Sequence, residues 1–303
     1  MQSKVLVVGS LNMDLVTRAE RLPRVGETLA GHSFTTVPGG KGANQAVAAV
    51  RLGASVAMVG CVGDDAYGQQ LSEALRVEGV DCQAVDIVTG VSSGVALIVV
   101  DASSQNAIVV VAGSNGCLQP TLIDRADALF QAADVIVCQM EVPPQAVAHA
   151  LARGRSLGKV VILNPAPVAG PLPVQWFANI DYLIPNETEA AALTGLRVDD
   201  LDSALVAVRH LRELGAANVI LTMGAQGALF ASSEGIEHFS APAVQAQDTT
   251  AAGDTFVGGF AAALGGGASE REAIVFGQRA AAISVTRAGA QPSIPMLAEV
   301  EAF

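Results

Sequence analysis

The sequence predicts a three-layer α/β fold (α-β-α), in which helices cover both faces of a central, mostly parallel β-sheet that carries a small additional sheet. Two observations lead to this prediction. Short apolar runs with turn signals nearby alternate with Ala-rich stretches of helical spacing, which is typical of a parallel sheet. Two segments interrupt the alternation with extended or hairpin-like character, and they indicate the additional sheet.

The elements of the main layer are predicted from apolar runs of strand length and from longer stretches of helical spacing. The predicted strands are Val5–Val8, Val56–Val59, Val135–Met140, Val160–Leu163, Tyr182–Ile184 and Val219–Thr222. The predicted helices are Ala43–Leu52, Gly68–Glu78, Gln145–Leu157, Glu187–Leu193, Leu201–Leu214 and Phe256–Leu264.

The additional sheet is expected from two regions. Residues from about Asp14 to Pro38 are extended and rich in turns, and Val95–Val100 and Ala107–Val111 form a predicted hairpin joined by Asp101–Asn106. We therefore expect a single domain, residues 1–303, with a lid sheet built from about 14–38 and 94–111.

Composition narrows the class of protein. Hydrophobic residues make up 51% of the 303 residues and charged residues 15%, as expected for a well-buried globular fold. The net charge is −12 and no Lys/Arg cluster stands out, so neither nucleic acid nor an anionic membrane is expected as the main partner. The apolar run at the N-terminus is too short for a signal peptide, and no uninterrupted apolar segment is long enough to span a membrane.

The four cysteines support the same class. Cys61, Cys82, Cys117 and Cys138 show no C-x-x-C spacing, and three of them lie in or beside apolar runs. We interpret all four as buried free thiols, and we expect a cytoplasmic protein.

The most informative stretch is Asp248–Phe256, a turn of small residues that opens directly into a helix. A helix N-terminus carries unpaired N–H groups and a partial positive charge, and it attracts anions. The carboxylate of Asp254 beside such a site is a poor phosphate ligand but a good general base for a hydroxyl. The stretch therefore suggests phosphoryl transfer to an alcohol.

A second Gly-rich segment, Gly39–Gln45, also precedes a predicted helix, so its backbone could approach a ligand closely. Lys41 and Asn44 would then supply donors, although a plain Gly-rich junction explains the pattern equally well. The segment is not a Walker A loop, because Gly42 follows Lys41 where Ser or Thr is required.

Polar residues also follow the ends of predicted strands, where ligands bind in open α/β sheets. Asn12 and Asp14 follow the first strand and could hold adjacent hydroxyls of a polyol, with an ordinary polar turn as the alternative. Their segment lacks the glycines of a dinucleotide fingerprint. Glu141 follows the strand Val135–Met140 in the same way.

Two further segments have both a functional and a structural interpretation. Asn186–Glu189 opens a helix, where Asn186 could bind phosphate and Glu189 could order Mg²⁺ waters, or the acids could only complement the helix dipole. Thr222–Gly227 could cradle a nucleotide or form a tight hairpin turn.

Two other patterns carry no function. Gly90–Gly94 matches G-x-S-x-G, but a strand-like run follows it instead of the helix that a hydrolase requires. The four histidines are scattered without metal-binding spacing.

Taken together, these segments resemble the ribokinase branch of the PfkB carbohydrate kinase family along essentially the whole chain. Gly39–Asn44 is similar to the family's N-terminal signature and Asp248–Phe256 to its C-terminal signature. The segments Asn164–Pro167, Pro185–Glu189 and Thr286–Ser293 fit the family in order. The resemblance implies a small β-sheet lid that also forms a homodimer interface, and transfer of the ATP γ-phosphoryl group, with Mg²⁺, to the 5-hydroxyl of ribose.

The resemblance also implies roles for individual residues. Asp254 matches the catalytic base, and the N–H groups of Ala252, Gly253 and Asp254 match the anion hole. Sugar-binding positions match Asn12, Asp14, Gly40, Lys41, Asn44, Glu141 and Asp254. Nucleotide-binding positions match Asn186, Thr222, Gly224, Gly227, Gly253 and Gln278, and Glu189 matches a position linked to Mg²⁺. Gln278 stands where relatives often carry Asn or His.

A monovalent cation, usually K⁺, is implied beside the anion hole. Its matching ligands, largely through backbone carbonyls, would be Asp248, Thr250, Ser284, Arg287, Gly289 and Ser293. Of these, Asp248 supplies a formal charge.

Two alternatives remain open at this point. The acceptor could be deoxyribose or a nucleoside, through small changes around Asn12, Met13 and the lid. The chain could instead be a non-catalytic protein that senses a sugar or nucleotide on the same fold. Asp254 and Gly253 favour catalysis, because a binding protein has no need of a base at the anion hole.

Overall fold

The computed structural model describes residues 2–103, 105–168 and 170–303. Its main sheet has nine strands in the order β13-β12-β11-β10-β9-β8-β1-β4-β5, and it is parallel except where β12 and β13 join antiparallel at one edge. The strands are β1 (Lys4–Val8), β4 (Ser55–Gly63), β5 (Asp81–Val88), β8 (Val135–Cys138), β9 (Val160–Leu163), β10 (Tyr182–Leu183), β11 (Asn218–Thr222), β12 (Ala228–Ser232) and β13 (Gly235–Phe239).

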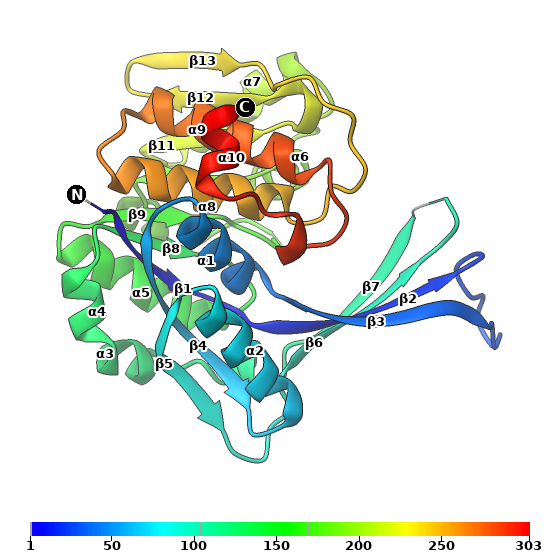
Figure 1. Cartoon of the computed structure of the whole chain (residues 1–303). Coiled ribbons are helices and arrows are strands. Elements are labelled where there is room, and N and C mark those ends of the chain that lie inside the picture. Colours follow the sequence, from blue (N-terminus) through cyan, green and yellow to red (C-terminus); the bar gives the residue numbers. More distant parts are fainter. Residues whose placement is uncertain (1, 104, 169) are drawn as a thin grey trace.

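Helices cover both faces of this sheet and divide the core into two clusters (Figure 1). Alternate residues of β1 show the division: Val5 and Val7 belong to one cluster, and Leu6 and Val8 to the other. The first face carries α1 (Lys41–Arg51), α2 (Ala66–Val77), α8 (Ala252–Gly265), α9 (Glu270–Ser284) and α10 (Leu297–Ala302). The second carries α3 (Pro120–Arg125), α4 (Asp127–Ala132), α5 (Pro144–Ser156), α6 (Glu187–Thr194) and α7 (Leu201–Glu213). The predicted three-layer architecture is confirmed.

Within the described residues, four short 3₁₀ helices complete the connections: η1 (Gly113–Cys117), η2 (Val174–Asn179), η3 (Gly224–Gln226) and η4 (Gln291–Ser293).

The additional sheet has four strands in the order β3-β2-β6-β7 and projects away from the main body (Figure 1). The strands are β2 (Asn12–Ala19), β3 (Gly31–Gly39), β6 (Gly94–Val100) and β7 (Asn106–Val111). The hairpin predicted from the sequence is the antiparallel pair β6–β7. Ser104, in its connection, lies outside the described residues. The parallel pair β2–β6 joins the hairpin to the preceding segment.

Close packing of α1 against α8 brings the two Gly-rich motifs together. Gly258 of α8 makes this approach possible, since a Cβ atom there would lie 2.5 Å from the Cβ of Ala48 and 2.7 Å from the carbonyl oxygen of Gln45. The two helices that begin at the motifs Gly39–Gln45 and Asp248–Phe256 are therefore in contact along their length.

Other expectations are met in part. Cys61, Cys82 and Cys138 are buried free thiols, but Cys117 is only partly buried because it ends the surface turn η1. Among the described residues, no helix combines the length and the apolar character needed to cross a bilayer.

Candidate active site

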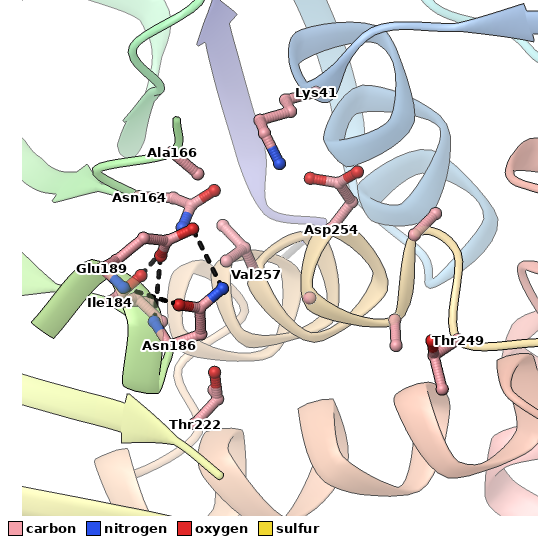
Figure 2. Close-up of a pocket in the computed structure, with 13 residues that line it drawn as sticks. Lys41, Asn164, Ala166, Ile184, Asn186, Glu189, Thr222, Thr249, Asp254 and Val257 are labelled. Atoms are coloured by element: carbon pink, nitrogen blue, oxygen red, sulfur yellow. Dashed lines mark hydrogen bonds between the residues drawn. The ribbon is translucent and has the colours of Figure 1, made fainter. Parts of the chain in front are cut away.

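A pocket opens at the carboxyl ends of β9, β10 and β11, beside the start of α8 (Figure 2). Its volume is about 180 Å³, which is smaller than a typical ligand pocket of about 300–1,000 Å³, so a nucleotide would extend beyond it. Of the residues given individual roles in the sequence analysis, seven line it: Lys41, Asn186, Glu189, Thr222, Ala252, Gly253 and Asp254.

The start of α8 presents free N–H groups to this pocket. Ala251, in the left-handed conformation at φ 59°, turns the chain into the helix. The N–H of Ala252 donates to the carbonyl oxygen of Thr249 (3.2 Å), whereas no partner within the described residues is recorded for the N–H groups of Gly253 and Asp254. The helix dipole adds positive potential at the same place, so these two donors can hold an anion.

Asp254 lies in the first turn of α8, and two amides of α1 hold its carboxylate. Asn44 Nδ2 donates to Asp254 Oδ2 (3.0 Å), and Gln45 Nε2 donates to Asp254 Oδ1 (2.9 Å). Asp254 is 7% exposed. Each carboxylate oxygen has a second lone pair left, which can accept a proton or a hydrogen bond from a ligand hydroxyl.

Gln45 is a residue that sequence reasoning missed. Its side chain also donates to Asn164 Oδ1 (3.0 Å) and accepts from Gln139 Nε2 (2.7 Å), so it links α1 to the ends of β8 and β9. A signal for Gln45 was present, because Lys41, Asn44 and Gln45 are spaced i, i+3 and i+4 and therefore share one face of a helix.

Lys41 brings a positive charge to the pocket, and Figure 2 shows its ammonium group pointing toward the Asp254 carboxylate. Burial alone would lower the pKa of Lys41, but the charges of Asp254, Glu141 and Glu189 outweigh it and hold the pKa above its usual value. Lys41 therefore stays charged and available to a phosphate.

Asn186 and Glu189 form a capping box at the start of α6. Glu189 N–H donates to Asn186 Oδ1 (2.8 Å), and Glu189 Oε2 accepts from the N–H of Asn186 (2.9 Å). These bonds give the two side chains a structural role at the start of the helix, and both side chains also line the pocket. Burial raises the pKa of Glu189, and the hydrogen bond from Asn186 and the charge of Lys41 oppose the rise.

A second group of predicted residues lies next to this pocket. Glu141 accepts hydrogen bonds from the Ser10 hydroxyl and from the backbone N–H of Lys41 (3.0 Å). Gly40 has φ 90°, and a Cβ atom there would lie 2.7 Å from the backbone nitrogen of Asn12. Burial, followed by the charges of Glu141 and Asp254, raises the pKa of Asp14 to about 7. Three carboxylates therefore surround the start of α1.

Asn115 is a second residue that the sequence analysis missed. Its amide donates to Asn12 Oδ1 (2.8 Å) and to the Leu11 carbonyl (3.0 Å), and its oxygen accepts from the Leu11 N–H (2.9 Å). These bonds fix the orientation of the Asn12 amide and leave its donor end for a ligand. Met13, in contrast, is 1% exposed and packs within the hydrophobic core.

The segment Thr222–Gly227 is a tight hairpin turn between β11 and β12. Thr222 lines the pocket, but Gly224 and Gly227 are not among the lining residues. Packing explains Gly227, since a Cβ atom there would lie 1.9 Å from the carbonyl oxygen of Phe239. Gln278 Nε2 donates to the same oxygen (2.9 Å), which places Gln278 beside this turn.

Asp248 joins the turn that enters α8 to the loop that follows α9. Its Oδ1 accepts from the N–H of Thr250 (2.9 Å) and its Oδ2 from the N–H of Gly289 (2.8 Å). Burial would raise the pKa of Asp248, but these bonds and the Thr250 hydroxyl lower it overall. The carbonyl of Ser284 accepts from the N–H of Arg287 (3.0 Å), and Ser293 is buried in η4 of the same loop. The guanidinium of Arg287 pairs instead with Glu299.

Known proteins resemble the chain along its whole length. The model described as pfkB family carbohydrate kinase matches residues 2–297. A ribokinase of Haemophilus influenzae is 43% identical over 307 residues, covering 100% of this chain and 99% of the relative. A deoxyribokinase of Salmonella typhi is 40% identical, covering 99% and 98%. The structure of Arabidopsis thaliana ribokinase complexed with ribose and ATP matches with a TM-score of 0.93 at 33% identity, covering 100% and 98%.

A helix start that can hold an anion, next to a buried carboxylate, is suited to phosphoryl transfer onto an alcohol. The chain belongs to the pfkB family of carbohydrate kinases, and its relatives place it with the ribokinase-like sugar kinases.

We predict that Asp14→Asn raises stability more at pH 8 than at pH 5. The folded protein keeps the Asp14 proton up to about pH 7, whereas the unfolded chain releases it near the ordinary value of 3.8. Wild-type stability therefore falls as the pH rises through this window, and the neutral amide avoids the loss. Thermal unfolding of wild type and variant at both pH values measures this difference in stability. Asp134→Asn, at an exposed position, is the control. An equal gain at pH 5 and pH 8 would contradict the cause assigned to the Asp14 pKa.

Proposed function

We propose that the protein is an ATP-dependent kinase that phosphorylates the 5-hydroxyl of D-ribose to give ribose 5-phosphate. The observation that carries this proposal is the carboxylate of Asp254, buried and held by two amides, beside the free N–H groups at the start of α8. The names of the ribokinase relatives support ribose as the acceptor.

In this proposal Asp254 is the general base. One of its oxygens accepts the proton of the sugar hydroxyl as the oxygen of that hydroxyl attacks the γ-phosphorus. The bond from the γ-phosphorus to the β,γ-bridging oxygen breaks, and ADP leaves. The N–H groups of Gly253 and Asp254, with Ala252 at the same turn, hold the charge on the transferring phosphoryl group. Positioning and charge stabilisation therefore supply most of the catalysis.

The remaining residues divide between the two substrates. The residues that would bind the sugar are Asn12, Asp14, Gly40, Lys41, Asn44 and Glu141. Asn44 Oδ1 is buried with no hydrogen-bond partner among the described residues, so it can accept from a sugar hydroxyl. The residues that would bind the nucleotide are Asn186, Thr222, Gly224, Gly227, Gly253 and Gln278. Two of them, Asn186 and Thr222, are neighbours, because their backbones form an isolated parallel β-bridge.

The site fits Mg²⁺ that arrives with the nucleotide. The described residues contain no group of three or more His, Cys, Asp or Glu side chains that could cage a metal. Mg²⁺ commonly keeps several waters and binds through substrate phosphates and one or two carboxylates. Glu189, 8% exposed in the pocket, would hold such waters. The ion would offset phosphate charge together with Lys41.

A monovalent cation, K⁺, would lie at the loop that Asp248 organises. Its ligands would be Asp248, Thr250, Ser284, Arg287, Gly289 and Ser293, mainly through carbonyl oxygens. The hydrogen bonds of Asp248 to Thr250 and Gly289 support this grouping, because they bring the two contributing segments together.

The projecting sheet would act as a lid over the sugar and as a homodimer interface in the cytoplasm. Its strands expose large apolar side chains, including Phe34 (61%), Ile108 (52%) and Val109 (61%). An isolated sheet with exposed apolar faces is a site for association with another surface. A second copy of the chain would cover these side chains.

Deoxyribose is the second candidate acceptor, because the deoxyribokinase relative is almost as similar to this chain as the ribokinase relative. A coupled assay of ADP release across ribose, deoxyribose, fructose 6-phosphate and nucleosides separates these activities. We predict the highest kcat/KM with ribose. A higher kcat/KM with deoxyribose would identify the protein as a deoxyribokinase. ATP binding without turnover of any acceptor would indicate a non-catalytic binding protein.

We predict that Asp254→Asn keeps the fold and sugar binding but lowers kcat by about 10²–10⁴-fold, since the amide cannot accept the proton. Calorimetric titration with ribose and the ADP-release assay check the two parts. Asp134→Asn, outside the pocket, is the matched control. A variant with a near-normal rate would refute the assignment of the base.

We predict that K⁺ stimulates the wild-type enzyme at constant ionic strength, because a cation would hold the carbonyls around Asp248 in place. The assay compares KCl with NaCl at equal concentration. Equal activity in the two salts would contradict the cation site and leave the kinase assignment intact.

A further inference from the structure

Arg51 is the last residue of α1 and makes four hydrogen bonds at the end of the helix opposite the active site. Its Nε and Nη2 donate to the two carboxylate oxygens of Glu78 (2.8 and 2.5 Å). Its Nη1 donates to the carbonyl oxygens of Gln291 (2.7 Å) and Ile294 (2.8 Å). The side chains of Arg51 and Glu78 are only 15% and 22% exposed, so this is a shielded, bidentate pair rather than a surface contact.

The two carbonyl bonds hold the loop that follows α9. Gln291 and Ile294 flank Pro292 and Ser293, so the guanidinium fixes the backbone on both sides of Ser293. Gly289 lies earlier in the same loop, and its N–H donates to Asp248 Oδ2 (2.8 Å). Arg51 therefore restrains one end of the loop, and Asp248 restrains the other.

Asp248 connects this loop to the anion-binding turn. Its other oxygen accepts from the N–H of Thr250 (2.9 Å), two residues before Ala252 begins α8. Asn44 and Gln45, near the start of α1, also contact the start of α8, because their amides donate to the carboxylate of Asp254. Helix α1 thus contacts the reacting carboxylate at one end and the loop that supports the anion-binding turn at the other.

We propose that Arg51, held by Glu78, is a positioning residue for the phosphoryl-transfer site: it fixes the 289–294 loop so that its carbonyls can bind the monovalent cation and support the entry to α8. The proposal rests on the proposed function. Arg51 is far along α1 from Lys41 and touches no reacting group, so its effect is expected on the cation and on turnover, with ribose binding preserved.

The experiment compares Arg51→Met, Arg51→Lys and Glu78→Gln with wild type. Arg51→Met keeps the aliphatic stem but removes every donor, and Arg51→Lys keeps the charge and donors that can reach the carbonyls. Arg155→Met is the matched control, because Arg155 pairs with Asp181 on the other face of the sheet. The first readout is the shift in melting temperature on adding KCl instead of NaCl, without substrates. The second is kcat and ribose KM against K⁺ concentration.

For Arg51→Met we expect the K⁺ concentration at half-effect to rise by about tenfold, in line with losing charged hydrogen bonds. Its kcat should fall while the KM for ribose stays within about twofold of wild type. So small a change in KM would indicate that no contact with the sugar is lost. Arg51→Lys should recover part of the response, Glu78→Gln should lie between the two, and Arg155→Met should match wild type.

An unchanged K⁺ titration in Arg51→Met would overturn the proposal. So would a general loss of stability with kcat and KM altered together at every K⁺ concentration. A wild type that phosphorylates sugars without any K⁺ response would also overturn it while leaving the proposed function standing. Conversely, a wild type without kinase activity would refute the proposed function. The shift in melting temperature between KCl and NaCl would still test the role of Arg51.

Discussion

The candidate active site depends on two hydrogen bonds that join residues more than 200 positions apart. Asn44 and Gln45, near the start of α1, donate to the two carboxylate oxygens of Asp254 at the start of α8. The bonds are possible because α1 and α8 pack closely at Gly258 on one face of the sheet. Gln45 extends the link to Asn164 and Gln139, beside the ends of β9 and β8. A single amide network therefore links the Asp254 carboxylate, at the start of α8, to the carboxyl ends of β8 and β9.

The candidate site combines a cluster of carboxylates with a local positive potential, although the chain as a whole is strongly negative. The protein carries a net charge of −12, and Asp14, Glu141 and Asp254 lie close together. Lys41 and the N–H groups of α8 supply the opposing local potential, and the neighbouring carboxylates keep Lys41 protonated. Burial of Asp14, followed by the charges of Glu141 and Asp254, raises its pKa, so keeping this carboxylate ionised in the folded protein costs stability at neutral pH. Such a strained arrangement of charge is typical of a functional site.

The sequence was sufficient to predict strands such as β1 and β8, because Val5–Val8 and Val135–Cys138 form continuous apolar runs. It did not predict the buried strand β12. It also did not predict β5 or β13, which lie at the sheet edges with partly exposed residues and no such run. In the site, the motifs around Lys41 and Asp254 were recognisable because each precedes a helix. Gln139 and Asn115 were not, because they act through contacts about 100 residues away that leave no local pattern. Tertiary packing, rather than local sequence, selects these residues.

A crystal structure of the protein with ribose and a non-hydrolysable ATP analogue would test most directly whether Asp254 is the base beside an anion-binding turn. We expect the 5-hydroxyl within hydrogen-bond distance of a carboxylate oxygen of Asp254, and oxygens of the γ-phosphate on the N–H groups of Gly253 and Asp254. Lys41 should contact the phosphate, while Asn44 and Gln45 keep their bonds to Asp254. A sugar whose hydroxyl faces another side chain would contradict the assignment of Asp254 as the base, and a γ-phosphate bound away from the start of α8 would contradict the anion site.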